Sequence, residues 1–166
     1  MSELLLGCGR SREKRIAIGP RSWTDLTTLD CYDACEPDIV WDLNLTPWPL
    51  ESDAYDEVHA YEVLEHLGRQ GDYDSFFAHF SEIWRVLKPG GMLFATVPDR
   101  SSPWAWGDPG HTRVISLESL TFLSQSEYVK QTETMTDYRH IYSADFILRM
   151  AETKGDHFVF ILEARK

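Results

Sequence analysis

Residues 74–97 read DSFFAHFSEIWRVLKPGGMLFATV, and the two halves of this stretch have different periods. In residues 74–87 the apolar side chains recur every three or four positions, which predicts a helix with one apolar face. The Pro-Gly-Gly sequence at 89–91 ends that helix. The continuous apolar run at 92–97 then predicts a buried strand. A helix that leads through a short turn into a buried strand is typical of an α/β fold.

Similar patterns extend outward from this unit. The other expected strands are residues 4–6, 26–30, 38–43, 55–60 and 157–164. Ser116 is expected to cap a helix that includes Leu117, Leu120 and Leu123. Strands that alternate with helical or loop crossovers predict a mostly parallel α/β sheet that is covered on both faces. Residues 1–166 are expected to form a single domain.

The composition excludes several classes of protein. Asp and Glu total 27 and Lys and Arg total 16, so the net charge is −11, which argues against broad binding to nucleic-acid phosphates. Hydrophobic residues make up 43% of the chain, which argues against disorder. We find no apolar run near the ~20 residues that a membrane helix needs and no signal peptide at the start.

The cysteines indicate the redox environment. Cys8, Cys31 and Cys35 are an odd and sparse set, which fits a reducing cytoplasm better than a disulfide framework. Their spacing does not provide a recognisable set of metal ligands. We therefore expect a cytoplasmic protein with small buried thiols and no metal site.

The residues that follow the predicted strands are candidates for ligand binding, because ligands of open α/β sheets bind beyond the carboxyl ends of the strands. The first strand ends in Gly7-Cys8-Gly9, where glycines allow a sharp turn and close approach of a ligand to the backbone. The second strand ends in Asp30, whose carboxylate is positioned to accept hydrogen bonds from ribose hydroxyls. A surface carboxylate without a ligand is the alternative, and the upstream glycines favour the ribose.

The third and fourth strands end at the same edge. Asp42, Leu43 and Asn44 follow the third strand, where side-chain oxygens either accept a hydrogen bond from an adenine amine or form an Asx turn. Tyr61 and Glu62 follow the fourth strand, at the rim of the same cleft. For Asp42, the adenine contact and the Asx turn both stay open.

The charge of this edge favours a cationic ligand. Residues 22–68 contain no Lys or Arg and many Asp and Glu. Such a rim attracts a sulfonium or an ammonium and repels a pyrophosphate. This argues against a nicotinamide or flavin dinucleotide.

The ordered set of segments resembles the class I S-adenosylmethionine-dependent methyltransferases, particularly small bacterial and phage proteins of the methyltransferase-11 type. The matching segments are LLLGCG at 4–9, LD at 29–30, DIVWDL at 38–43, YDEVHAYEVLEHL at 55–67 and WRVLKPGGML at 84–93. The resemblance implies a Rossmann-like sandwich whose seven-stranded, mostly parallel sheet has one antiparallel strand, residues 157–164. It also implies S-adenosylmethionine as the cofactor and an unidentified methyl acceptor. A noncatalytic module that binds the adenosyl cofactor or a partner is the alternative.

The resemblance also assigns contacts to the cofactor. It implies that the methionine part lies at Gly7, Cys8 and Gly9, the ribose at Asp30, the adenine at Asp42 and Leu43, and the turn nearest the cofactor at Tyr61 and Glu62. Two features depart from the family pattern. The third glycine is missing, and Gly19-Pro20 breaks the usual first helix. The methionine carboxylate is therefore expected to meet Arg10 or Arg12.

Catalytic side chains are harder to assign, because alignment of two reactants alone supplies roughly 7–11 kcal/mol. His111 is the candidate general base, since a neutral imidazole accepts a proton near pH 7. In the alternative, His111 and Arg113 only fix their loop. Trp104 and Trp106 either form a lid or stack on a planar substrate, or they pack against the sheet edge. His66 either faces the cleft or caps a helix.

Overall fold

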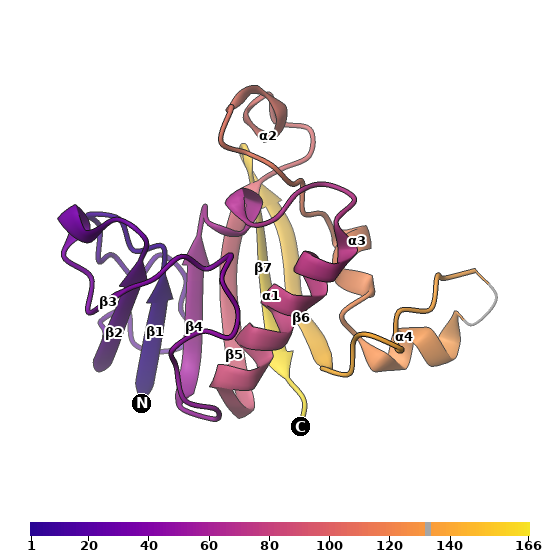
Figure 1. Ribbon diagram of the computed structural model, residues 1–166, viewed down its shortest axis with the longest axis horizontal. Coiled ribbons are helices and arrows are strands. Elements are labelled where there is room, and N and C mark those ends of the chain that lie inside the picture. Colours follow the sequence, from indigo (N-terminus) through magenta and orange to yellow (C-terminus); the bar gives the residue numbers. More distant parts are fainter. Residues whose placement is uncertain (132–133) are drawn as a thin grey trace.

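The computed structural model describes residues 1–131 and 134–166. One seven-stranded sheet has the strand order β3-β2-β1-β4-β5-β7-β6 (Figure 1). The strands are β1 (Ser2–Leu6), β2 (Asp25–Asp30), β3 (Ile39–Val40), β4 (Tyr55–Tyr61), β5 (Leu87–Pro98), β6 (Phe146–Lys154) and β7 (His157–Ala164). Neighbours from β3 to β5 are parallel, whereas β7 runs antiparallel to both β5 and β6. The expected inserted strand is confirmed.

One long helix covers the sheet. α1 (Tyr73–Val86) crosses one face, and its N-cap Asp72 accepts a hydrogen bond from the Ser75 N–H at 3.1 Å (Figure 1). The shorter helices are α2 (Trp104–Gly107), α3 (Leu117–Thr121) and α4 (Gln125–Lys130), and the 3-10 turns are η1 (Asp33–Cys35) and η2 (Leu64–His66). α1 and α3 bury their apolar side chains in the same core as alternate residues of β1, β4 and β7.

Two boundaries differ most from the sequence prediction. β5 begins at Leu87 and includes the Pro-Gly-Gly sequence at 89–91, because a bulge opposite Tyr55 and Glu57 absorbs these residues within the strand. β3 is only Ile39–Val40 rather than 38–43. The Asp38 carboxylate instead accepts hydrogen bonds from the N–H and hydroxyl of Thr28, at 2.8 and 2.7 Å, so side-chain bonds replace ladder bonds there.

The second face of the sheet has a different cover. Among the described residues no helix lies between β1 and β2, as the Gly19-Pro20 sequence predicts. Ile16 and Trp23 from this connection pack against Leu5, Cys8 and Tyr61. The sheet is thus covered on both faces, as expected. Helices cover one face, whereas on the other face an extended segment packs against β1 and β4.

A buried ion cluster anchors that extended connection. The Lys14 ammonium lies 2.6 Å from Glu3 on β1 and 2.6 Å from Glu57 on β4, and all three side chains are buried or nearly so. Burial alone would lower the pKa of Lys14, but the hydrogen bonds to both carboxylates raise it. Lys14 therefore stays charged and ties residues 10–24 to the sheet. Within the described residues, no helix combines the length and the apolar character needed to cross a membrane.

Candidate functional site

The turn after β1 requires its glycines for different reasons. Gly7 and Gly9 both have left-handed backbone angles, with φ of 56° and 52°. A Cβ on Gly7 would lie 2.4 Å from Cγ2 of Val63, so the turn packs directly against the end of β4. A Cβ on Gly9 would meet no atom within 4 Å. The backbone at Gly9 is therefore open to a ligand.

Asp30 connects this turn to the end of β2. Its Oδ2 accepts the Gly9 N–H at 2.8 Å, and its Oδ1 accepts the Tyr32 N–H at 2.9 Å. A carboxylate offers about four lone-pair sites. One site on each oxygen therefore remains for two further donors, such as the two hydroxyls of a ribose.

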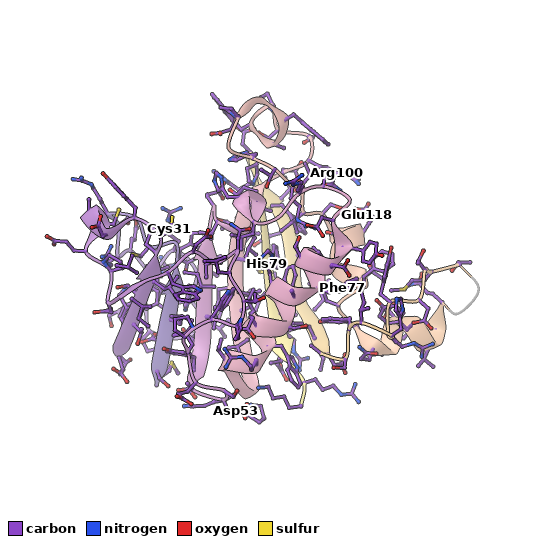
Figure 2. The ribbon with its side chains drawn as sticks, viewed as in Figure 1. Cys31, Asp53, Phe77, His79, Arg100 and Glu118 are labelled. Carbon is purple, nitrogen blue, oxygen red and sulfur yellow. The ribbon has the colours of Figure 1, made fainter. Side chains whose placement is uncertain are left out.

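A cavity of about 260 Å³ lies at the carboxyl edge of β1, β2 and β4. It is lined by Gly7, Asp30, Cys31, Trp41, Asp42, Leu43, Asn44, Glu62, Val63, His66 and Leu67. Figure 2 labels Cys31 at this edge and Asp53 at the opposite edge of the sheet. The lining residues include three carboxylates and no Lys or Arg. The cavity therefore suits a positively charged, partly apolar ligand.

Asp42 and Leu43 lie together on one wall of the cavity. The Asp42 Oδ1 accepts the Asn44 N–H at 2.9 Å, so the Asx turn is confirmed. The turn and a ligand contact are compatible, because the second oxygen of Asp42 is not used in that bond. Asn44 in turn accepts the Gly68 N–H at 2.9 Å, which connects this turn to the segment that follows η2.

Glu62 is held in a strained conformation at the end of β4. Its φ is 56°, and its N–H donates to the Thr96 carbonyl at 2.9 Å. A residue other than glycine in the left-handed region costs of order 1–3 kcal/mol, and such residues cluster at functional sites. The Glu62 carboxylate lies 3.1 Å from Nδ1 of His157 and lines the cavity.

Two predicted contacts place their side chains elsewhere. Cys8 and Tyr61 are buried with Leu5 on the second face of the sheet, and neither lines the cavity. The Tyr61 hydroxyl lies 2.6 Å from Nδ1 of His59 and accepts the Ile16 N–H at 3.2 Å. Burial raises the pKa of Tyr61 to about 12.

The side chain of Arg12 is hydrogen-bonded to backbone carbonyls of the protein. Its guanidinium donates to the carbonyls of Gly9, Cys35 and Glu36 at 2.6, 2.8 and 3.1 Å. These bonds fasten η1 to the glycine turn. These bonds use part of the donor capacity of Arg12, and Arg10 is exposed, so a contact of either residue with a methionine carboxylate stays a prediction.

The segment after β4 brings Glu65, His66 and His111 together. Thr112 and Arg113 donate their N–H groups to the Glu65 carbonyl at 2.9 and 3.1 Å, which fixes the 107–113 loop beside η2. His66 lines the cavity, whereas His111 does not, and its Nε2 lies 3.9 Å from Glu65. Burial raises the pKa of Glu65 to about 8, and the charges of Glu62 and Asp108 act in the same direction.

Arg113 fixes its loop, as one of the two interpretations of the sequence expected. Its buried guanidinium donates to the carbonyls of Leu67 and Asp72 at 3.1 and 2.8 Å. Trp104 and Trp106, by contrast, are 62% and 70% exposed on α2, which projects beyond the carboxyl edge (Figure 1). Packing of these indoles against the sheet edge is therefore wrong, and neither indole lines the cavity.

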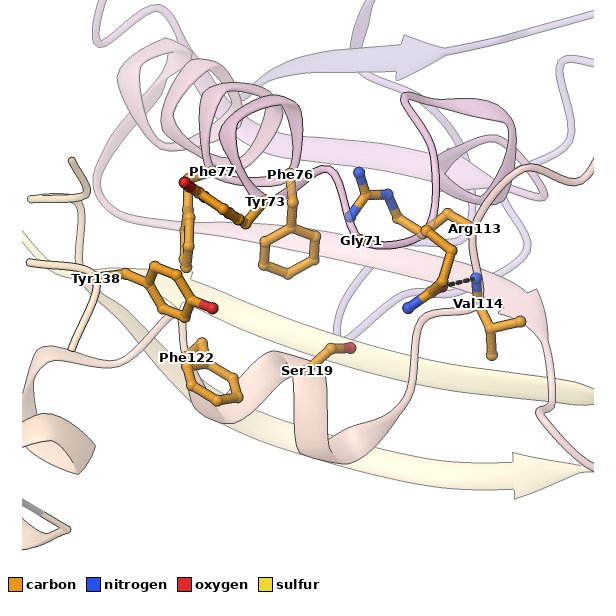
Figure 3. Close-up of a pocket in the computed structure, with 10 residues that line it drawn as sticks. Gly71, Tyr73, Phe76, Phe77, Arg113, Val114, Ser119, Phe122 and Tyr138 are labelled. Carbon is orange, nitrogen blue, oxygen red and sulfur yellow. Dashed lines mark hydrogen bonds between the residues drawn. The ribbon is translucent and has the colours of Figure 1, made fainter. Parts of the chain in front are cut away.

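A second hollow of about 230 Å³ lies on the α1 face. Figure 3 shows Phe76 and Phe77 of α1 facing Phe122 and Tyr138 across it. Its one charged lining side chain, Arg113, is already bonded to backbone carbonyls. The groups with acid–base potential lie instead at the carboxyl edge.

Comparison with known proteins identifies the class. A family model described as a methyltransferase domain matches residues 5–95, which is more than half of the 166 residues. The chain therefore belongs to this family of methyltransferase domains. The resemblance to class I S-adenosylmethionine-dependent methyltransferases is confirmed by the match and by the sheet order.

Particular relatives share parts of the chain or its fold. A probable S-adenosylmethionine-dependent methyltransferase of Mycolicibacterium smegmatis is 31% identical over 96 residues, which cover 55% of this chain and 35% of the relative. The match thus spans about a third of that relative's length. A SAM-dependent methyltransferase structure from Archaeoglobus fulgidus has a TM-score of 0.61 at 14% identity, over 98% of this chain and 85% of that chain.

A further structure with this fold is the N-methyltransferase NodS from Bradyrhizobium japonicum WM9 in complex with S-adenosyl-L-homocysteine. Its TM-score is 0.54 at 14% identity, over 99% of this chain and 78% of that chain. At such low identity, both structures establish the fold alone.

Sequence reasoning missed several residues of the cavity. Cys31, Trp41, Val63 and Leu67 line it but were not assigned to it, whereas contact with the cleft was one of the two interpretations of His66. Each lies within a few residues of a strand end that had been identified. Extending each strand end by several residues, rather than one or two, would have included them.

Proposed function

We propose that this chain binds S-adenosylmethionine at the carboxyl edge of the sheet and transfers its methyl group to an acceptor still to be identified. The observation that carries the proposal is the joint position of Gly7, Asp30 and Asp42 on one acidic cavity. The free lone pairs of Asp30 match a pair of ribose hydroxyls. The open backbone at Gly9 leaves room for the rest of the cofactor.

The chemistry needs little from the protein beyond position. When bound, the cofactor supplies a methyl group on a cationic sulfur, which becomes a neutral thioether as an acceptor lone pair bonds to the methyl carbon. Asp30, Asp42 and Glu62 give the cavity the negative potential that favours a sulfonium. The glycine turn and the bonds of Asp30 fix the floor of the cavity. Alignment of the reactants supplies roughly 7–11 kcal/mol in this kind of reaction.

Two further properties accompany the proposal. The three cysteines are free in the structure, which supports a reducing, cytoplasmic location. The net charge of −11 supports an acceptor that does not require broad contact with a nucleic-acid backbone. The exposed Trp104 and Trp106 are candidates for contact with that acceptor, since amphipathic indoles stack on planar groups.

Calorimetric titration with S-adenosylhomocysteine tests the cofactor site. We expect Asp30→Asn to weaken binding by roughly 10- to 100-fold, because a hydrogen bond to a charged group contributes about 1.5–3 kcal/mol. Asp53→Asn is the matched control, because Asp53 lies at the opposite edge of the sheet (Figure 2). The wild type should bind as tightly as this control. Absence of binding to the wild type, or equal binding by both variants, would contradict the proposal.

Methyl transfer is then measured separately. We expect wild-type chain, methyl-labelled S-adenosylmethionine and a panel of metabolite and macromolecule extracts to yield labelled acceptor and S-adenosylhomocysteine. Asp30→Asn should lose this product at low cofactor concentration and recover part of it at high concentration. Tight binding with no labelled product from any extract would instead favour the noncatalytic module.

A further inference from the structure

Glu65, His66 and His111 form a compact group of potential metal ligands beside the cavity. One ligand atom from each residue lies within 4.8 Å of the others. The Nε2 atoms of His66 and His111 lie 4.0 and 3.9 Å from the same carboxylate oxygen, Oε1 of Glu65. The two rings meet edge to face with their centroids 4.7 Å apart.

The hydrogen bonds of the two imidazoles fix which nitrogen is available. Nδ1 of His66 lies 2.9 Å from the Gly110 carbonyl, and Nδ1 of His111 lies 2.8 Å from the Trp104 carbonyl. A carbonyl only accepts, so both Nδ1 atoms carry the proton. When both rings are neutral, the lone pair of each therefore lies on Nε2, the nitrogen that is 4.0 or 3.9 Å from Oε1 of Glu65. Metal-binding histidines commonly donate their other N–H to a carbonyl in this way.

Glu65 lacks the partners that a buried carboxylate needs. The residue is 2% exposed, and within the described part of the chain neither of its side-chain oxygens has a hydrogen-bond partner. The nearby charges that act on it, from Glu62 and Asp108, are negative. An unpaired buried carboxylate is costly unless a cation or donors compensate it. Two lone-pair nitrogens beside it add no donor.

We propose that Glu65, His66 and His111 bind one divalent transition-metal ion at the edge of the cavity. Two imidazole nitrogens and one carboxylate suit Zn²⁺, Co²⁺ or a similar ion better than Ca²⁺ or Mg²⁺. Tetrahedral ligand atoms about 2.1 Å from an ion are about 3.4 Å apart, so the separations of 3.9 and 4.0 Å must shorten by about 0.5 Å when an ion binds. The histidine nitrogens, which lie within 4.8 Å of each other, must also approach.

The site has room for a further ligand. Three protein ligands leave at least one coordination position open, as in metal sites that bind water or substrate. Asp108 lies 3.9 Å from Nε2 of His111 and can supply an additional oxygen. His66 lines the cavity, so one side of the ion would face it. Metal binding goes beyond the proposed function and does not depend on it, because it is measured without cofactor or acceptor.

Cobalt uptake by the full chain tests the proposal. Chelator-stripped protein is titrated with Co²⁺, and binding is followed by calorimetry and by the visible absorbance of the bound ion, with Zn²⁺ as competitor. We expect one equivalent to bind, and Glu65→Gln and His111→Gln each to weaken binding at least about 100-fold, the upper range for loss of an outer partner. His66→Gln changes a partly exposed side chain and provides a third variant whose folding is least at risk.

Matched controls separate this site from other metal-binding groups. His157→Gln removes another imidazole at the same edge, and Cys31→Ser with Cys35→Ser removes the more accessible thiols. Both should retain wild-type cobalt affinity. Co²⁺ should raise the thermal midpoint of the wild type and not that of Glu65→Gln, because a ligand that binds only the folded state stabilises it. No uptake by the wild type at millimolar Co²⁺, or undiminished uptake by Glu65→Gln and His111→Gln, would overturn the proposal.

Discussion

At the scale of single residues, the two glycines after β1 differ in what a side chain would meet. Alanine at either position costs about 1 kcal/mol for the left-handed backbone. Gly7→Ala also drives a Cβ to 2.4 Å from Val63, so it should lower the free energy of unfolding by about 1–3 kcal/mol more than Gly9→Ala. Urea unfolding measures both, and Val63→Ala in the Gly7→Ala background should restore part of the loss. Equal destabilisation by the two variants would contradict the packing argument.

The same pair separates packing from cofactor binding. Gly9→Ala extends a methyl group into the open space where we place the cofactor, and it should weaken S-adenosylhomocysteine binding at least about tenfold. Its fold should remain intact, since nothing in the structure lies within 4 Å of that methyl. Calorimetry on folded Gly9→Ala measures the effect. Unchanged affinity would move the cofactor away from this turn.

The sequence correctly predicts that residues share a cleft where their position depends only on the end of a strand. Asp30, Asp42 and Glu62 were expected on one cleft and line one cavity. The side chains of Cys8 and Tyr61, two of the residues assigned to the cofactor, lie on the other face of the sheet. In β4 the residues Glu57, His59 and Tyr61 alternate with Val58 and Ala60, so the parity that turns Tyr61 away from the α1 face was already present in the sequence.

The group of Glu65, His66 and His111 was not predicted, because its three residues form no local ligand spacing in the sequence. His111 is distant in sequence from the other two. The group forms because the backbone N–H groups of Thr112 and Arg113 bind the Glu65 carbonyl. Such a contact between two loops has no periodic signal.

At the scale of elements, the connection between β1 and β2 replaces a helix with an ion cluster. Lys14→Met would leave Glu3 and Glu57 buried without their cation, so the free energy of unfolding should fall by about 3–5 kcal/mol. Lys154→Met removes an exposed lysine paired with Glu152 and should change the free energy of unfolding by at most about 1 kcal/mol. Denaturant unfolding compares the two. A small effect of Lys14→Met would mean that the connection is held by its apolar contacts alone.

Elements with strong periodicity were predicted well, and those set by tertiary contacts were not. α1 was expected at 74–87 and is Tyr73–Val86, because apolar residues at helical spacing and the capping Asp72 act locally. β6 had no predicted boundaries, and its alternation is weak, with exposed residues such as Leu148. Its position depends on pairing with β7, which sequence periodicity does not encode.

At the scale of the whole molecule, buried histidines link stability to pH. His79 faces the core from α1, and burial lowers its pKa to about 4, with the charge of Arg113 acting in the same direction. In the unfolded chain the pKa is about 6.5. Between these values the unfolded chain binds more protons than the folded chain, so this contribution to stability is lost as the pH falls from about 6.5 toward 4. Glu65 acts in the opposite sense, since its raised pKa makes the folded state the better proton binder between about 4.5 and 8.

A comparison of variants isolates the histidine from this opposing effect. The difference in unfolding free energy between wild type and His79→Leu should shift in favour of the variant by about 2–3 kcal/mol as the pH falls from 7 to about 4.5, because leucine has no proton to gain on unfolding. His140→Leu, at an exposed position, should show no comparable shift. Urea unfolding at several pH values in this range measures both differences. If the wild type and His79→Leu lose stability in parallel, then His79 is not the group that takes up the proton, and another buried group such as His59, whose pKa burial also lowers to about 4, would account for acid sensitivity.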